Sequence, residues 1–136
     1  MKMIITNKHV IFSAENALYR KTVNLTHDQV ISKLKSKGIE CYTVNGMYDK
    51  PEKSILVVNP TDLVIDLITQ LCTKLGQESI IQTENGTNML LFLNGPNAGK
   101  AYYGKGTQYF NSKPENYYTQ LGETYFSHNL DFSRLI

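Results

Sequence analysis

The chain has 136 residues, of which 41% are hydrophobic and 19% are charged, and this balance excludes an intrinsically disordered protein. Its formal net charge of +2 gives little long-range attraction for a nucleic-acid backbone or an acidic membrane, so neither a long nucleic acid nor a membrane is an expected partner. Without a cysteine framework, a signal-peptide h-region or an apolar run near about 18 residues, nothing in the sequence indicates secretion or membrane insertion. These features favour a cytoplasmic protein in which Cys41 and Cys72 are buried free thiols.

The N-terminal segment predicts short strands followed by a helix. Lys2–Thr6 and His9–Ser13 are both rich in β-forming residues, so one is expected as a strand and the other as its approach. From Ala14 the apolar residues recur at helical spacing as far as Val23, and Ser13 is available as the N-cap of this helix.

A second helix and a further strand are expected next. Thr26 and Gln29 form a capping box, in which each side chain binds the backbone N–H of the other residue, and Gly38 supplies the left-handed residue that ends the helix. The alternating segment Ile39–Met47 is expected as a strand that bends or ends at Asn45-Gly46, because this dipeptide favours a tight turn.

The middle of the chain predicts the most buried elements. Lys53–Asn59 is apolar on both faces and is expected as a central strand that is covered on both sides. Asn59-Pro60-Thr61-Asp62 opens the strongest helix, and Gly76 ends it. This helix is expected to be heavily buried, because its apolar face is formed by Val64, Leu67, Ile68, Leu71 and Leu75.

The second half of the chain predicts hairpins, with turn signals at Asn85-Gly86 and Asn94–Asn97. The polar stretch Asn111–Gly122 is expected as a loop. Strands are expected at Ser79–Thr83, Met89–Leu93, Ala101–Tyr103, Thr107–Phe110 and Thr124–His128. Early helices and late hairpins favour an α+β fold in which residues 1–136 form one domain, with a mostly antiparallel sheet and two or three helices packed against one side of it.

Familiar catalytic and metal-binding motifs are absent from the sequence. Gly99–Gly106 matches a phosphate-binding loop as far as its lysine, but it lacks the Ser or Thr that follows and the helix that such a loop begins. A hairpin in which Lys100 and Lys105 contact a phosphate remains an open alternative. The three histidines lack the spacing of metal ligands, and neither a metal nor a cofactor is predicted. No Ser, Cys or Asp lies in a recognised nucleophile motif.

Two short strings combine a carboxylate with a hydroxyl and are the best candidates for a binding site. Pro51-Glu52-Lys53-Ser54 comes where the central strand begins, and Gly76-Gln77-Glu78-Ser79 comes where the next strand begins. Local turns, in which Glu and Ser bind nearby backbone N–H groups, explain either string. The alternative is that both strings converge on one polar pocket.

These strings also carry a resemblance to small proteins of unknown function from phage and bacterial genomes. Their shared pattern has an Asn-bearing helix, a Gly-x-Tyr segment, a Glu-x-Ser strand and a Gly-Gln-Glu-Ser string. In this chain the pattern is carried by Glu15-Asn16, Arg20, Gly46-Met47-Tyr48, Glu52-Lys53-Ser54 and Leu75–Ser79. The resemblance implies a phage accessory protein that acts in the host cytoplasm and counters host defence.

Three functions remain open at this point. The first is a homo-oligomeric binding protein that sequesters a small anionic or nucleotide-like signalling molecule. The second is an enzyme that cleaves or modifies such a ligand, with Glu52 and Glu78 as a general acid–base pair. The third is an inhibitor of a host protein that docks through its aromatic C-terminal half. The residues expected to contact the ligand are Asn16, Arg20, Tyr48, Glu52, Ser54, Gln77, Glu78 and Ser79, with Lys100 and Lys105 as phosphate partners.

Overall fold

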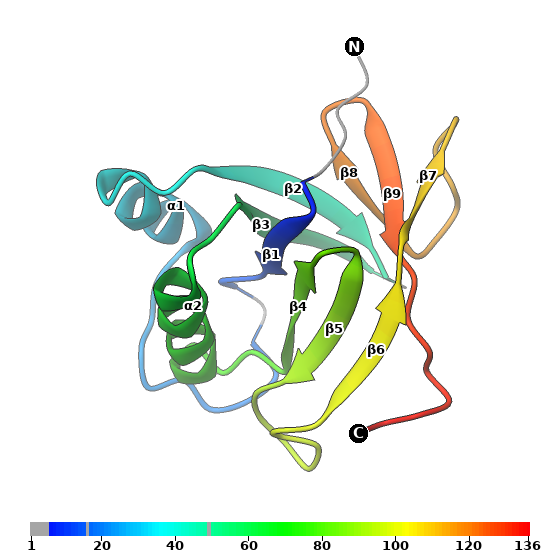
Figure 1. The fold of residues 1–136 in the computed structure, drawn as a ribbon. Coiled ribbons are helices and arrows are strands. Elements are labelled where there is room, and N and C mark those ends of the chain that lie inside the picture. Colours follow the sequence, from blue (N-terminus) through cyan, green and yellow to red (C-terminus); the bar gives the residue numbers. More distant parts are fainter. Residues whose placement is uncertain (1–5, 16, 49) are drawn as a thin grey trace.

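The computed structural model describes residues 6–15, 17–48 and 50–136, and all structural statements below concern these residues. In this part of the chain, a nine-stranded antiparallel sheet curves around the molecule in the order β6-β5-β4-β1-β3-β2-β8-β9-β7, and two helices lie against one side of it (Figure 1). The α+β class and the mostly antiparallel sheet are therefore confirmed. The elements are β1 (Lys8–Phe12), α1 (His27–Ser36), β2 (Cys41–Met47), β3 (Pro51–Val58), α2 (Asp62–Lys74), β4 (Ser79–Glu84), β5 (Thr87–Phe92), β6 (Ala101–Lys105), β7 (Thr107–Phe110), β8 (Tyr118–Leu121) and β9 (Thr124–His128).

Alternate residues of the central strands face two different cores. Phe12 of β1 and Ile55 of β3 pack in the larger core, which includes buried residues of both helices. Ile11 and Leu56, the neighbouring residues of the same strands, belong to a smaller core with Phe126 of β9. Because successive side chains of a strand point to opposite faces, β3 is covered on both sides, as its apolar run predicts.

The starts of both helices are fixed by the side chains that the sequence indicates. Thr26 Oγ1 accepts from Gln29 N at 3.2 Å, and Gln29 Oε1 accepts from Thr26 N at 2.9 Å, so the predicted capping box is present. At α2, the hydroxyl of Thr61 accepts from Val64 N at 3.2 Å. No helix among the described residues has the length and apolar character needed to cross a membrane.

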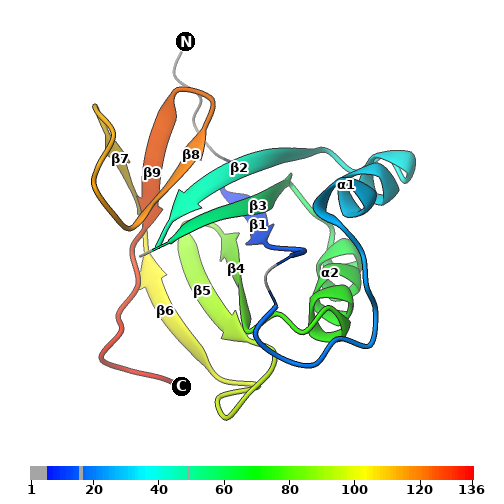
Figure 2. The same cartoon turned by 180° about the vertical axis from the view of Figure 1, so that it is seen from behind.

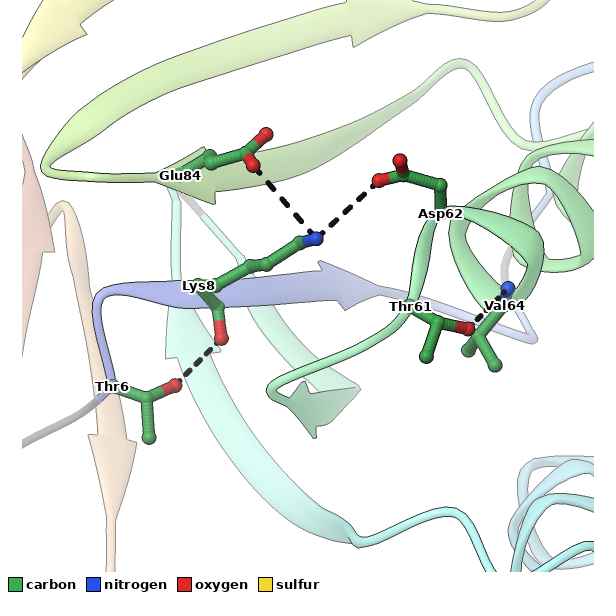
Figure 3. A network of polar contacts seen from close by, with 6 residues as sticks. All are labelled: Thr6, Lys8, Thr61, Asp62, Val64 and Glu84. Carbon is green, nitrogen blue, oxygen red and sulfur yellow. Dashed lines mark hydrogen bonds and ion pairs between the residues drawn. The ribbon is translucent and has the colours of Figure 1, made fainter.

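Lys8 of β1 forms ion pairs with the first residue of α2 and with the last residue of β4. Lys8 Nζ lies 3.3 Å from Asp62 Oδ1 and 3.8 Å from Glu84 Oε1, beside the Thr61 cap (Figure 3). The two carboxylates are mostly exposed, so water screens both ion pairs and each contributes little to stability.

The segment after β1 is not the helix that its apolar spacing predicts. The described residues between Ser13 and Leu25 form bends and extended chain. Tyr19 N donates to the Gly76 carbonyl at 3.1 Å, and Thr22 N donates to the Lys74 carbonyl at 2.8 Å. The carbonyls at the end of α2 lack partners within that helix, so these long-range hydrogen bonds replace local helical ones. Figure 2 shows the segment passing beside α2 on its way to α1.

Two other predictions need correction, and both involve β8. The turn predicted at Asn45-Gly46 does not form, because β2 continues to Met47 and Gly46 pairs with residues of β3 and β8. The predicted loop Asn111–Gly122 contains β8, which pairs with both β2 and β9. Of the predicted strand Lys2–Thr6, only Thr6 lies within the described residues, and His9–Ser13 corresponds to β1.

After β9 the chain returns along the outer edge of β6. Asp131 N donates to the Tyr103 carbonyl at 2.8 Å, and Ala101 and Ile136 exchange two backbone hydrogen bonds of 2.7 and 2.9 Å. The segment 129–136, which we call the C-terminal tail, can approach so closely because β6 has a glycine: a Cβ on Gly104 would lie 2.0 Å from the carbonyl oxygen of Asn129. The tail therefore covers an edge strand that would otherwise be open.

Candidate functional site

A cavity of about 260 Å³ lies at the end of the central strands, mostly on the face that turns away from the helices. It is bounded by the end of β1, the beginnings of β3 and β4, the end of β2 and part of the C-terminal tail. The lining residues are Ile11, Phe12, Ser13, Gly46, Tyr48, Glu52, Ser54, Ser79, Ile80, Ile81, Leu90, Thr119, Leu130 and Phe132.

Three serines form a row across neighbouring strands of this cavity. Ser13 directly follows β1, and extension of the strand register places it between Ser54 of β3 and Ser79 of β4. The Oγ atoms of Ser13 and Ser54 lie 2.8 Å apart. The next row along the strands consists of Leu56, Ile11, Ile81, Leu90 and Tyr102, and of these the apolar Ile11, Ile81 and Leu90 line the cavity. The lining thus passes from polar to apolar within one step along the strands.

Glu52 adds a carboxylate to the polar part of the cavity. The hydroxyl of Ser13 donates a short hydrogen bond to Glu52 Oε1. Ser13 and Ser54 are only 5% and 8% exposed, so this hydroxyl pair is shielded from bulk water and holds the carboxylate in one orientation. Glu52 itself is half-buried and lines the cavity, where a cationic group of a ligand can reach it.

Gly46 makes room for the aromatic ring of Tyr48. A Cβ on Gly46 would lie 2.6 Å from Tyr48 Cε2, so the ring rests against this glycine in β2. The Tyr48 hydroxyl forms a short hydrogen bond with Thr119 Oγ1 of β8. Burial raises the pKa of the Tyr48 phenol, and the nearby Glu52 carboxylate raises it further, whereas the Thr119 contact lowers it. The phenol is therefore a neutral hydrogen-bonding group at physiological pH.

The string before β4 has a different role from the string in β3. Gln77 Nε2 donates to the Glu15 carbonyl at 2.9 Å, and the Tyr19 hydroxyl donates to Glu78 Oε2 at 3.4 Å. A Cβ on Gly76 would lie 2.3 Å from the Tyr19 carbonyl oxygen, so the two segments pack without space between them. Gln77 and Glu78 hold the segment 14–25 in place and do not line the cavity, which only the final serine of the string reaches.

The other predicted site residues lie away from the cavity. Arg20 is exposed on the segment that packs against Gly76, and Asn16 lies outside the described residues. Lys100 and Lys105 are exposed at the two ends of β6, and neither lines the cavity. Of the predicted site residues, the cavity brings together Tyr48, Glu52, Ser54 and Ser79.

Sequence reasoning misses Ser13, Thr119, Leu130 and Phe132, all of which line the cavity. Ser13 continues the alternation of β1, and this signal could have placed it beside Ser54. Thr119 lies in the strand that was expected as a loop. Leu130 and Phe132 follow the last strand in a segment without periodicity, so no local pattern connects them to a site.

A buried histidine pair lies deeper on the same face of the sheet. His9 Nε2 of β1 and His128 Nε2 of β9 are 2.7 Å apart, and both side chains are less than one-tenth exposed. His9 Nδ1 donates to the Thr6 carbonyl at 2.8 Å, so the neutral His9 ring accepts from His128. Burial lowers the pKa of His9, and burial together with His9 lowers the pKa of His128 to about 3. The pair therefore joins β1 to β9 in its neutral form.

The chemistry available in the cavity comes from oxygen atoms and aromatic rings. Among the described residues, no group of three or more His, Cys, Asp or Glu side chains is placed to hold a metal ion. Cys41 and Cys72 are buried free thiols, and burial raises the pKa of both. Within the described part of the chain, the lining offers one carboxylate, several hydroxyls and a tyrosine ring beside an apolar surface.

Comparison with known proteins places the chain in one family. Residues 10–129 match the model of the S-adenosylmethionine lyase family, a range that includes every lining residue except Leu130 and Phe132. No curated protein matches the chain. The family is known from phage anti-defence proteins, which supports the expected phage accessory protein. The match also fits a counter-defence protein that acts on a nucleotide-like molecule.

Proposed function

Because the chain belongs to the S-adenosylmethionine lyase family, we propose that it binds S-adenosylmethionine in this cavity and cleaves it there. The observation that carries the proposal is the oriented Glu52 carboxylate, which lies beside Tyr48 at the edge of an apolar cavity. S-adenosylmethionine has a charged methionine part and a largely uncharged adenosine part, which correspond to the polar and apolar regions of the cavity. Glu52 attracts the ammonium group of the methionine part, and the ring of Tyr48 provides a face for a cation.

Cleavage by a lyase adds no water, so the new bond to carbon forms within the substrate. The sulfonium sulfur takes both electrons of the breaking carbon–sulfur bond and leaves as a neutral thioether. When the methionine carboxylate attacks the chain carbon next to sulfur, the products are methylthioadenosine and homoserine lactone, and no proton needs to move. A negative and a positive charge disappear together in this step, and the apolar lining favours such a change over the charged ground state.

In this route the side chains position the substrate and need not remove a proton. Glu52 holds the ammonium group, so that the carboxylate of the same substrate can reach the carbon next to sulfur. The serine row and Thr119 supply hydroxyl groups for the polar atoms of the substrate. Glu78, whose carboxylate faces the Tyr19 hydroxyl, has no part in this route.

The proposal is tested by incubating the purified protein with S-adenosylmethionine and identifying the products by mass spectrometry. We expect methylthioadenosine and homoserine lactone in equal amounts. Replacement of Glu52 by Gln removes the charge and keeps the shape of the side chain, so kcat/KM should fall about 100-fold, equivalent to about 2.7 kcal/mol. Glu84→Gln is the matched control, because Glu84 is an exposed carboxylate outside the cavity, and it should leave the rate unchanged.

The outcomes of this assay separate the functions that the sequence left open. If S-adenosylmethionine binds and no product forms, sequestration of the ligand replaces cleavage as the function. If it neither binds nor reacts, the proposal is wrong, and inhibition of a host protein becomes the leading hypothesis. Homo-oligomerisation remains a separate prediction, which light scattering coupled to size-exclusion chromatography tests.

A further inference from the structure

The C-terminal tail forms one wall of the cavity. Its backbone is fixed to β6 by the hydrogen bonds of Asp131 and Ile136 to Tyr103 and Ala101. Within the tail, Asp131 Oδ1 accepts from both Ser133 N at 3.0 Å and Ser133 Oγ at 2.5 Å. The local turn around the intervening residue, Phe132, is therefore held at both ends.

The side chain of Phe132 is largely exposed, although its ring packs against another aromatic ring. Its ring packs edge-on against Tyr102, with centroids 5.2 Å apart, and Tyr102 packs in the same way against Phe92 at 5.9 Å. Nevertheless 64% of Phe132 is exposed, although it lines the cavity together with half-buried Leu130. An aromatic side chain that is supported from behind and left open toward a cavity offers a flat surface to a ligand.

The position of this wall suits an uncharged, planar part of a ligand. The cavity carries its carboxylate and serines in one region, whereas Leu130 and Phe132 accompany Ile11, Ile81 and Leu90 in the apolar region. Of the described residues that line this apolar region, none has a charged side chain. In S-adenosylmethionine the adenine is the planar and uncharged part.

We propose that Leu130 and Phe132 form the adenine-binding wall of the site, with the Phe132 ring stacked on the base. This inference rests on the proposed function, because it takes adenine from that substrate. Both residues lie beyond the range 10–129 that matches the family model, so the match itself assigns them no role. Phe132 is a positioning residue, since it contacts the base and none of the reacting atoms.

The test uses the full chain and compares Phe132→Ala, Phe132→Tyr and Ile136→Ala. Ile136 is the control, because it lies in the same tail, is 61% exposed and does not line the cavity. Adenosine binding is measured directly by calorimetry, and inhibition of turnover is measured with adenosine and with methionine. Base–aromatic stacking predicts that Phe132→Ala weakens adenosine binding and raises the KM for S-adenosylmethionine by about tenfold. The kcat should remain within about twofold of the wild-type value, since the ring adds equally to ground-state and transition-state binding.

Adenosine binding tests the adenine-binding wall, whereas product formation tests the lyase function. Retention of adenosine affinity in Phe132→Tyr and Ile136→Ala, with unchanged inhibition by methionine in Phe132→Ala, supports the adenine wall. The proposal is overturned if the wild-type protein does not bind adenosine, if Phe132→Ala binds it normally, or if that variant loses adenosine and methionine to the same extent. Adenosine binding that depends on Phe132 without any cleavage would overturn the lyase function and leave the adenine wall in place.

Discussion

The two faces of the central strands differ sharply at positions that are neighbours in sequence. Toward the helices, Phe12 and Ile55 are closely packed in the larger core. Toward the cavity, the adjacent Ser13 and Ser54 present hydroxyl groups and hold the carboxylate of Glu52. A closely packed apolar face thus lies behind serine hydroxyls that line the cavity at the ends of the strands. Substitutions at neighbouring positions of one strand should therefore act differently, one on the stability of the fold and the next on the cavity.

Truncation of Ile55 is expected to have the largest effect on stability. Ile55 is fully buried, and its replacement by Ala leaves a cavity in the helix-side core, so the free energy of unfolding should fall by about 2–5 kcal/mol. Urea denaturation measures this loss, and turnover per folded molecule should be unchanged. Ser54→Ala, the adjacent position on the other face, should cost less than about 1.5 kcal/mol, the value of a hydrogen bond. Equal losses in the two variants would contradict the division between the faces.

Two glycines that end the helices provide the second test. Gly38 and Gly76 have nearly the same φ, +75° and +76°, but a Cβ meets nothing within 4 Å at Gly38 and meets the Tyr19 carbonyl at 2.3 Å at Gly76. Gly38→Ala should cost about 1–2 kcal/mol, which is the penalty for the left-handed conformation. Gly76→Ala should cost about 3 kcal/mol, because the clash adds to that penalty. Thermal unfolding of the two variants measures the difference, and similar melting temperatures would argue against close packing of the segment 14–25.

The histidine pair makes the stability of the cavity side depend on pH. The folded-state pKa values of His9 and His128 are lowered, so both rings are neutral in the native protein and the unfolded chain binds more protons below about pH 6.5. The contribution of the two neutral histidines to the free energy of unfolding is therefore fully present above this pH. It is lost as the pH falls toward the pKa of about 3 for His128. Between pH 7 and pH 5 the loss from His128 alone is about 2 kcal/mol. Denaturation at several pH values should show this slope, and His128→Gln should make it shallower.

The smallest of the expected effects separates two tyrosines of similar exposure. Tyr48 and Tyr42 are 37% and 38% exposed, but the hydroxyl of Tyr48 binds Thr119 beside the cavity and that of Tyr42 binds Glu40 on the surface. Tyr48→Phe keeps the ring and loses the contact that orients it, so kcat/KM should fall about tenfold, equivalent to about 1.4 kcal/mol. Tyr42→Phe should leave the rate unchanged. A comparable fall in both variants would indicate a general effect on the fold.

The parts of the fold that follow from local signals could be predicted from the sequence. The capping box at Thr26, the apolar run of β3 and the glycine at the end of α2 each act within a few residues, and the structure contains all three. The segment 14–25 could not be predicted in this way, since its backbone bonds to the end of α2 override its helical spacing. Strand β8 could not be predicted locally either, because it pairs with β2, which lies far away in the sequence, as well as with β9.

The candidate site shows the same limit. Glu52, Ser54 and Ser79 line the cavity and could be singled out because they lie at strand ends in short polar strings, whereas Tyr48 was singled out by the Gly-x-Tyr resemblance. Glu78 is in an equally suggestive string, but its direction depends on the packing of Tyr19, which has no local signature. The segment Gly99–Gly106 has the glycine and lysine spacing of a phosphate-binding loop, but it forms strand β6, with Lys100 just before the strand and Lys105 at its end, and neither lysine lines the cavity.

The route of the tail along β6 also affects the solubility of the protein. By occupying backbone groups of that strand, the tail denies other molecules a template for intermolecular strand addition. A truncation before Leu130 would expose this strand and invite aggregation, in addition to opening the cavity. Loss of activity in such a truncated protein would therefore have two causes, whereas a substitution at Phe132 changes the wall and keeps the strand protected.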